Sequence, residues 1–264
     1  MNKNDAQKWS LEVFEDQETL VGTVADRICL TVQSSQKNND SCVLSLAAGA
    51  TPLSIYKELA RRRIDEGFSF EHCVIFGLDE YFPISPNDPH SFYRYLHRIA
   101  FLLGIPDENV HLPRGDVPRS EIAAHCEQYE QMIKEAGGID FLLLGIGRSG
   151  HIGFNEPGSL LQQRTRLVSL HEVTRQDAAH VFGTIDDVPQ DAITVGIATV
   201  FDAREVVLIA FGEHKAPIVK ELVEGLSSPE VPASFLLSHK NVFIFVDSKA
   251  ASMLSGQPGA SRVI

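Results

Sequence analysis

The sequence lacks three features that would each direct it to a particular class of protein. No stretch approaches the ~18 apolar residues that a membrane-spanning helix needs, and residues 1–5 are not followed by the apolar core of a signal peptide. Its four cysteines are widely spaced without a Cys-x-x-Cys pair, which argues against a disulfide framework or a zinc site. We therefore expect a cytoplasmic protein with free thiols, no membrane contact and no bound metal.

Positive charge is also scarce. The 264 residues include 23 Lys and Arg against 35 Asp and Glu, so the formal net charge is −12. A general binder of nucleic acid or of anionic membranes would carry the opposite excess. Net charge does not exclude a small anionic ligand, because a local cluster of basic residues is enough to bind one.

Short apolar runs alternate with amphipathic segments along the chain. Strands are predicted at residues 43–46, 73–78, 139–147, 193–200, 206–211 and 242–246. Helices are predicted from Thr51-Pro52 onward, with Thr51 as the N-cap, and at residues 90–103, 120–138 and 215–224. This alternation predicts an α/β fold with an open, mostly parallel sheet flanked by helices. The unbroken apolarity of residues 139–147 indicates a strand covered on both faces.

One domain is expected over residues 1–264, because no linker divides the chain. The segment 162–191 is polar and poor in apolar periodicity, although predicted strands flank it. Long irregular connections of this kind often carry function. We therefore expect this segment to be irregular and to form a lid over a binding site.

Polar and glycine-rich residues follow several predicted strands, at the edge where such sheets bind ligands. Small residues at 47–50 would let backbone N–H groups approach an anion, but taken alone this loop fits an ordinary turn better. Asp79 follows a predicted buried strand, and a desolvated carboxyl group there can act as a general base. An isolated Asp-Glu pair is, however, more often a helix cap or a surface ion pair.

Residues 147–158 are the most informative stretch. His151 can move protons near neutral pH, and Glu156 can orient its imidazole and raise its basicity. A structural histidine is the alternative, but the glycines, the nearby acid and the position after a strand favour function. Lys215, at another strand-to-helix junction, can bring positive charge to an anionic ligand, although a lone lysine there is usually solvated.

Taken together, these motifs resemble the glucosamine-6-phosphate deaminase family. The most specific string is Gly-His-Ile-Gly-Phe-Asn-Glu-Pro at residues 150–157, and Leu-Asp-Glu-Tyr at 78–81 precedes His-Ser-Phe-Tyr at 90–93. The resemblance covers roughly residues 20–246 in order. It implies a fold similar to ribose-5-phosphate isomerases and CoA-transferases, and conversion of glucosamine 6-phosphate and water to fructose 6-phosphate and ammonia. It implies a sugar phosphate as the small-molecule partner, with no metal or organic cofactor, and it allows a homo-oligomer.

The resemblance also assigns roles by position. Asp79 matches the base that moves a proton between C2 and C1, His151 the residue that opens the sugar ring, and Glu156 its carboxylate partner. The residues at positions where the family holds the phosphate are Gly49, Ala50, Thr51 and Lys215.

Three positions depart from the family pattern. Ser149 stands where many members carry Asp in the ring-opening set, which leaves Glu156 as the expected orienter. His180 stands where many members carry a lid arginine that reaches the phosphate, so we expect His180 near the phosphate. Val168 replaces the lysine of an Arg-x-Lys effector motif, which implies an incomplete allosteric site.

Other functions share much of this residue set. A galactosamine-6-phosphate deaminase needs the same acid–base groups and differs in the recognition of one hydroxyl. A 6-phosphogluconolactonase needs no enolising base at Asp79, and a non-catalytic sugar-phosphate sensor needs only the pocket. The presence of Asp79, His151 and Glu156 together favours an enzyme over a sensor.

Overall fold

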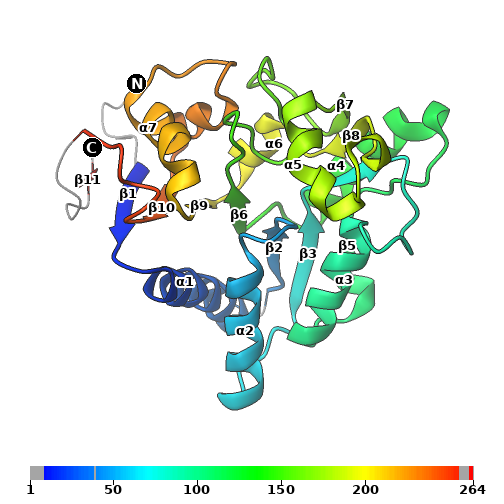
Figure 1. The fold of residues 1–264 in the computed structure, drawn as a ribbon. Coiled ribbons are helices and arrows are strands. Elements are labelled where there is room, and N and C mark those ends of the chain that lie inside the picture. Colours follow the sequence, from blue (N-terminus) through cyan, green and yellow to red (C-terminus); the bar gives the residue numbers. More distant parts are fainter. Residues whose placement is uncertain (1–8, 39, 256–261, 264) are drawn as a thin grey trace, which may run out of the picture.

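A computed structural model describes residues 9–38, 40–255 and 262–263 of the chain, so the expectation drawn from residues 1–5 lies outside the described residues. Figure 1 shows a large sheet between two layers of helices, with a smaller sheet beside it. The larger sheet contains seven parallel strands, and an eighth, β11, pairs antiparallel with β1 at one edge. The expected open, mostly parallel α/β sheet is therefore confirmed.

The strands of the larger sheet follow the spatial order β11-β1-β10-β9-β6-β2-β3-β5. They are β11 (Arg262–Val263), β1 (Trp9–Phe14), β10 (Val242–Asp247), β9 (Glu205–Ala210), β6 (Phe141–Gly145), β2 (Cys42–Leu46), β3 (Cys73–Gly77) and β5 (Val110–His111). The α-helices are α1 (Gln17–Lys37), α2 (Leu53–Asp65), α3 (Phe92–Leu103), α4 (Ile122–Glu135), α5 (Glu172–Phe182), α6 (Ile197–Asp202) and α7 (Ala216–Glu224). Short 3-10 turns are η1 (Asp107–Asn109), η2 (Arg119–Glu121), η3 (Ile185–Asp187), η4 (Glu213–Lys215) and η5 (Pro232–Ser238). None of the helices in the described ranges is both long and apolar enough to cross a membrane.

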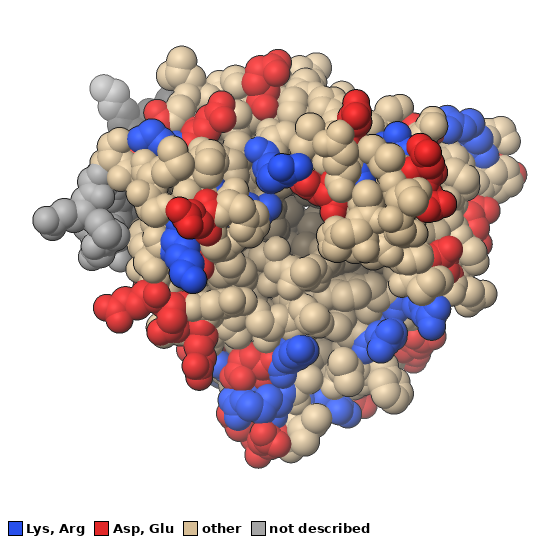
Figure 2. Space-filling model, in the orientation of Figure 1, with Lys and Arg blue, Asp and Glu red and all other residues tan. Residues whose placement is uncertain are grey.

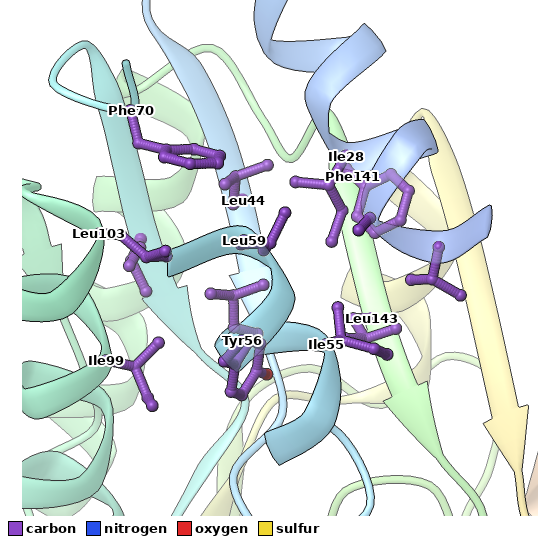
Figure 3. Close-up of a cluster of buried hydrophobic side chains, with 14 of the residues drawn as sticks. Ile28, Leu44, Ile55, Tyr56, Leu59, Phe70, Ile99, Leu103, Phe141 and Leu143 are labelled. Carbon is purple, nitrogen blue, oxygen red and sulfur yellow. The ribbon is translucent and has the colours of Figure 1, made fainter. Parts of the chain in front are cut away.

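Two apolar clusters, one on each face, hold the helices on the larger sheet. On one face α1, α2 and α3 pack against the strands, and Figure 3 shows Ile28, Leu59 and Leu103 among the side chains that meet there. On the other face α4, α6, α7 and η5 contribute the second cluster. Strand β6 is buried by both clusters, through Phe141 and Leu143 on one face and Leu142 and Leu144 on the other. This arrangement confirms the prediction that its two faces are covered.

The smaller sheet changes one strand prediction. It consists of β4 (Asp79–Phe82), β8 (Asp191–Thr194) and β7 (Arg166–Ser169), all antiparallel. The strand predicted at 193–200 is wrong in its second half, because β8 ends at Thr194 and α6 begins at Ile197. Gly196 allows the change of direction: a Cβ atom there would lie 2.1 Å from the Gln163 carbonyl oxygen.

Two local expectations also need correction. The segment 162–191 is not irregular, because β7, α5 and η3 occupy most of it. Thr51 is not the N-cap of α2: Pro52 holds that position without a side-chain cap bond, and Thr51 lies in the turn before it. The amide of Leu53 already bonds to the Ala50 carbonyl, so the chain turns before the helix begins.

The two-sided burial of β6 gives a stability prediction. Leu143→Ala should lower the free energy of unfolding by about 2–5 kcal/mol, because it leaves a cavity at a fully buried position. Leu30→Ala, at a position that is 64% exposed on α1, serves as the control and should change it by less than about 0.5 kcal/mol. Urea denaturation measures both, and equal effects would show that β6 is not packed as described.

Candidate active site

A cavity of about 500 Å³ opens at the carboxyl edge of the larger sheet. It lies between the neighbouring strands β2 and β6. From β2 the chain continues to β3 and β5 on one side of β2, whereas β6 and then β9 and β10 are added on the opposite side. The loops that follow the two strands therefore separate, which leaves the crevice that ligands occupy in such sheets. Figure 2 shows a hollow on this face of the molecule with Lys and Arg side chains at its edge.

Seven of the nine site residues expected from the sequence line this cavity. They are Gly49, Ala50, Thr51, Asp79, His151, His180 and Lys215. The other two, Ser149 and Glu156, lie behind the cavity wall and face the imidazole of His151. The structure thus brings together segments separated by more than 150 residues.

Asp79 is the first residue of β4, where the chain leaves the larger sheet. Leu78 still bonds to Val195 through its carbonyl, and Asp79 then pairs with Thr194 in the smaller sheet. The side chain is buried, and no hydrogen bond from the described part of the chain reaches its carboxyl group. The pKa of Asp79 is raised to about 8, mainly by burial and to a smaller extent by the negative charge of Glu80. Such a carboxyl group is a stronger base than an exposed one.

Glu80, the next residue, is also buried, and burial raises its pKa too, but its carboxyl group is hydrogen-bonded. Its Oε2 accepts hydrogen bonds from the Ser91 hydroxyl at 2.6 Å and from the Tyr93 amide at 2.8 Å, and its Oε1 accepts from the amides of Tyr81 and Phe92. The carboxyl group therefore sits on the N-terminus of α3, where the helix dipole favours a negative charge. Glu80 fixes β4 to α3 and so fixes the position of Asp79.

The ring of His151 packs against the backbone of Gly147. A Cβ atom at Gly147 would lie 2.0 Å from the imidazole, so only glycine leaves room for the ring there. Gly153 has a similar role beside Asp79: its φ is +56°, and a Cβ atom would lie 3.1 Å from the Asp79 Oδ2. These two glycines explain why the loop after β6 needs residues without side chains.

Two groups face Nδ1 of His151. The Ser149 hydroxyl lies 2.9 Å from Nδ1, and the Glu156 carboxylate oxygen Oε2 lies 3.5 Å from it. The structure thus places the serine hydroxyl closer than the acid expected to orient the ring. Burial lowers the pKa of His151, while the charge of Glu156 opposes this shift. The other ring nitrogen, Nε2, has no hydrogen-bond partner among the described residues, and His151 lines the cavity.

Lys215 is half-buried rather than a solvated residue at a helix start. Its Nζ donates a hydrogen bond to the Ile146 carbonyl at 2.8 Å, directly after β6. Burial lowers the pKa of its ammonium group. Across the cavity, the hydroxyls of Tyr56 and Tyr95 bond to the carbonyls of Ala47 and Gly49 and fix the loop that follows β2.

His180 lies on α5 at the exposed rim of the cavity, with Nδ1 2.7 Å from the Asp177 carbonyl oxygen. Sequence reasoning missed three other residues of this wall. Thr174 is buried with its hydroxyl unpaired among the described residues, and Arg148 and Asp177 form an ion pair. Only the helical spacing of Thr174 and Asp177 pointed to a shared face, and nothing in the sequence places that face opposite Arg148. Within the described ranges, no group of three or more His, Cys, Asp or Glu side chains is placed to hold a metal ion.

Comparison with known proteins identifies the family. A family model described as glucosamine-6-phosphate isomerases/6-phosphogluconolactonase matches residues 15–245. The chain belongs to this family. The matched range includes every site residue described above.

Individual family members are similar over most of the chain. A glucosamine-6-phosphate deaminase of Arthrobacter sp. is 45% identical over 224 residues, which cover 84% of this chain and 85% of that protein. A putative glucosamine-6-phosphate deaminase-like protein of Bacteroides thetaiotaomicron is 38% identical over 94% of this chain, but the match spans only 38% of that longer protein. A solved structure described as a monomeric glucosamine-6-phosphate deaminase superposes with a TM-score of 0.87 at 36% identity, covering 92% of this chain and 99% of that one.

The contrast between Asp79 and Glu80 gives a prediction about this family member. Glu80→Gln should lower the pKa of Asp79 from about 8, because it removes the neighbouring negative charge while burial remains. NMR titration of the Asp79 carboxyl carbon, assigned with Asp79→Asn, measures the change. Circular dichroism checks that α3 keeps its N-terminus, and an unmoved titration would show that burial alone sets the pKa.

A second prediction concerns the two groups at Nδ1. Glu156→Gln should lower the pKa of His151 further, because the carboxylate charge stabilises the imidazolium. Ser149→Ala is the matched comparison and should shift this pKa less, since it removes a neutral hydroxyl. Titration of the imidazole proton signals separates the two, and a larger effect of Ser149→Ala would assign the electrostatic role to the serine.

Proposed function

We propose that the chain is a glucosamine-6-phosphate deaminase, which converts glucosamine 6-phosphate and water to fructose 6-phosphate and ammonia. One observation carries this proposal: a buried carboxyl group with a raised pKa shares a single cavity with a paired histidine and a half-buried lysine. The similarity to named deaminases over most of the chain supports it.

Ring opening comes first in the proposed reaction. In this step Nε2 of His151 accepts and donates the proton, because Nδ1 faces Ser149 and Glu156. The neutral imidazole takes the proton of the C1 hydroxyl and returns a proton to the ring oxygen, which breaks the C1–O5 bond. The lowered pKa of His151 keeps the imidazole neutral and ready to accept a proton near pH 7.

Asp79 then acts on the open chain. Its carboxylate removes the proton from C2 and delivers it to C1 through an enediol-type intermediate. Over the same step the C1 oxygen gains a proton and becomes a hydroxyl while the amino nitrogen gives one up, which leaves an imine at C2. Water adds to this imine and ammonia leaves. With a pKa of about 8, roughly a tenth of the carboxyl groups are ionised at pH 7, and those that are ionised are strong bases.

The phosphate is proposed to bind at the loop after β2 and at Lys215. Gly49, Ala50 and Thr51 contribute a loop of small residues, Lys215 contributes a half-buried charge, and His180 lies at the rim. We also propose that residues 162–191 act as the lid, because α5 of this segment forms one wall of the cavity. A cytoplasmic location accords with the four free, buried cysteines.

The buried Asp79 also bears on the alternatives. A lactonase has no step that needs an enolising base, so a carboxyl group held at a raised pKa favours a deaminase. Recognition of a single hydroxyl separates glucosamine 6-phosphate from galactosamine 6-phosphate, and both sugars therefore belong in the assay.

The central prediction is release of ammonia from glucosamine 6-phosphate and its loss in Asp79→Asn. That variant should reduce turnover by about 100-fold or more, because it removes the base proposed to transfer the proton between the carbons. Binding of fructose 6-phosphate, measured by calorimetry, should stay within a few-fold of wild type. Asp65→Asn on the surface of α2 is the control and should retain full turnover.

Three results would contradict the proposal. Near-normal turnover of Asp79→Asn would remove Asp79 from the chemistry. Hydrolysis of 6-phosphogluconolactone without release of ammonia from either amino sugar would make the protein a lactonase. Binding of sugar phosphates without any turnover would make it a sensor.

A further inference from the structure

An ion pair joins two walls of the cavity. Arg148 lies in the loop after β6, and Asp177 lies on α5. The Nε of Arg148 is 3.0 Å from Oδ2 of Asp177, and a second guanidinium nitrogen contacts Oδ1, so the pair is bidentate. Both side chains line the cavity together with Lys215.

This ion pair contributes little to the stability of the fold. The two side chains are 49% and 41% exposed, and ion pairs at that exposure contribute little to folding because water screens them. The pair does act on the cavity: the charge of Asp177 raises the pKa of Lys215 and the charge of Arg148 lowers it, although burial has the larger effect. Both charges are therefore within electrostatic range of the residue proposed to bind phosphate.

A phosphate group in the cavity would meet these charges with opposite results. Arginine offers a planar fork of N–H donors that fits a phosphate as well as it fits a carboxylate. The Asp177 carboxylate repels a phosphate and holds the same N–H groups that a phosphate would use. Carboxylate and phosphate therefore compete for one guanidinium.

We infer that Arg148 exchanges the Asp177 carboxylate for the substrate phosphate and so selects phosphorylated sugars. In this arrangement Asp177 holds Arg148 in place at the cavity until a phosphate binds. When the phosphate binds Arg148, the ion pair with Asp177 breaks, and α5 loses this contact with the loop after β6. The inference rests on the proposed function, since it takes the ligand to be a sugar phosphate.

The two partners of the pair should then have opposite effects on binding. Arg148→Ala removes a charge-assisted contact with the phosphate, so it should weaken binding by roughly ten- to hundredfold. Asp177→Asn removes the competitor and its repulsion, so it should tighten binding by about threefold or more. If the ion pair only supports the fold, either substitution breaks it, and both should change binding in the same direction.

Calorimetry on the full chain tests this with fructose 6-phosphate, fructose and inorganic phosphate as ligands. Arg61→Ala is the matched control, because Arg61 is 47% exposed and is also paired through two nitrogens, with Glu58, on the distant helix α2. Fructose has no phosphate, so its binding should be unchanged in Arg148→Ala, in Asp177→Asn and in Arg61→Ala. Circular dichroism confirms that each variant is folded.

Opposite shifts of the Kd for fructose 6-phosphate in Arg148→Ala and Asp177→Asn support the inference. Parallel weakening in both, or an unchanged Kd in Arg148→Ala, overturns it while the proposed function stands. If wild type binds inorganic phosphate through Arg148 but does not bind fructose 6-phosphate, the anion exchange stands and the proposed function fails. Absence of binding to both ligands overturns both.

Discussion

Two neighbouring carboxyl groups are buried at the same point of the chain, and the site depends on the difference between them. Glu80 receives four hydrogen bonds, three of them from the N-terminus of α3, and these bonds oppose the burial that raises its pKa. Asp79 receives none from the described residues, so the cost of burial falls on its charged form and raises its pKa. One acid thus fixes the backbone, and its neighbour is left reactive on a rigid support.

The sheet topology explains why this acid meets the histidine. β3 and β6 are separated by β2, and the loops after all three strands open on the same edge of the sheet. Asp79 follows β3, His151 follows β6, and Gly49 follows β2, so neighbouring strands place all three around one crevice. The close approach of the His151 ring to Gly147 then keeps the imidazole within the wall rather than across the cavity.

The sequence predicted elements whose signal is local. The apolar runs of β2, β3, β9 and β10 are short and continuous, so their strands were predicted to within one residue at each end, whereas β6 is two residues shorter at each end than the run at 139–147 predicted. The run at 193–200 misled because apolarity alone does not distinguish the end of β8 from the start of α6. β1 and α1 were not predicted, and the antiparallel pairing of β4, β7 and β8 depends on contacts between distant segments. The same limit applies to Arg148 and Asp177, which pattern alone could not bring together.

Net charge and local charge act at different distances in this molecule. The net charge of −12 repels a phosphate dianion from afar, but that repulsion falls off over a Debye length of about 8 Å at physiological salt. Inside the cavity the half-buried Lys215 is screened less than a surface lysine. Asp79 adds little negative charge there at pH 7, because its raised pKa keeps most of it protonated. Burial of one acid therefore serves two ends at once: it makes a stronger base, and it leaves the cavity positive enough to admit an anion into an acidic protein.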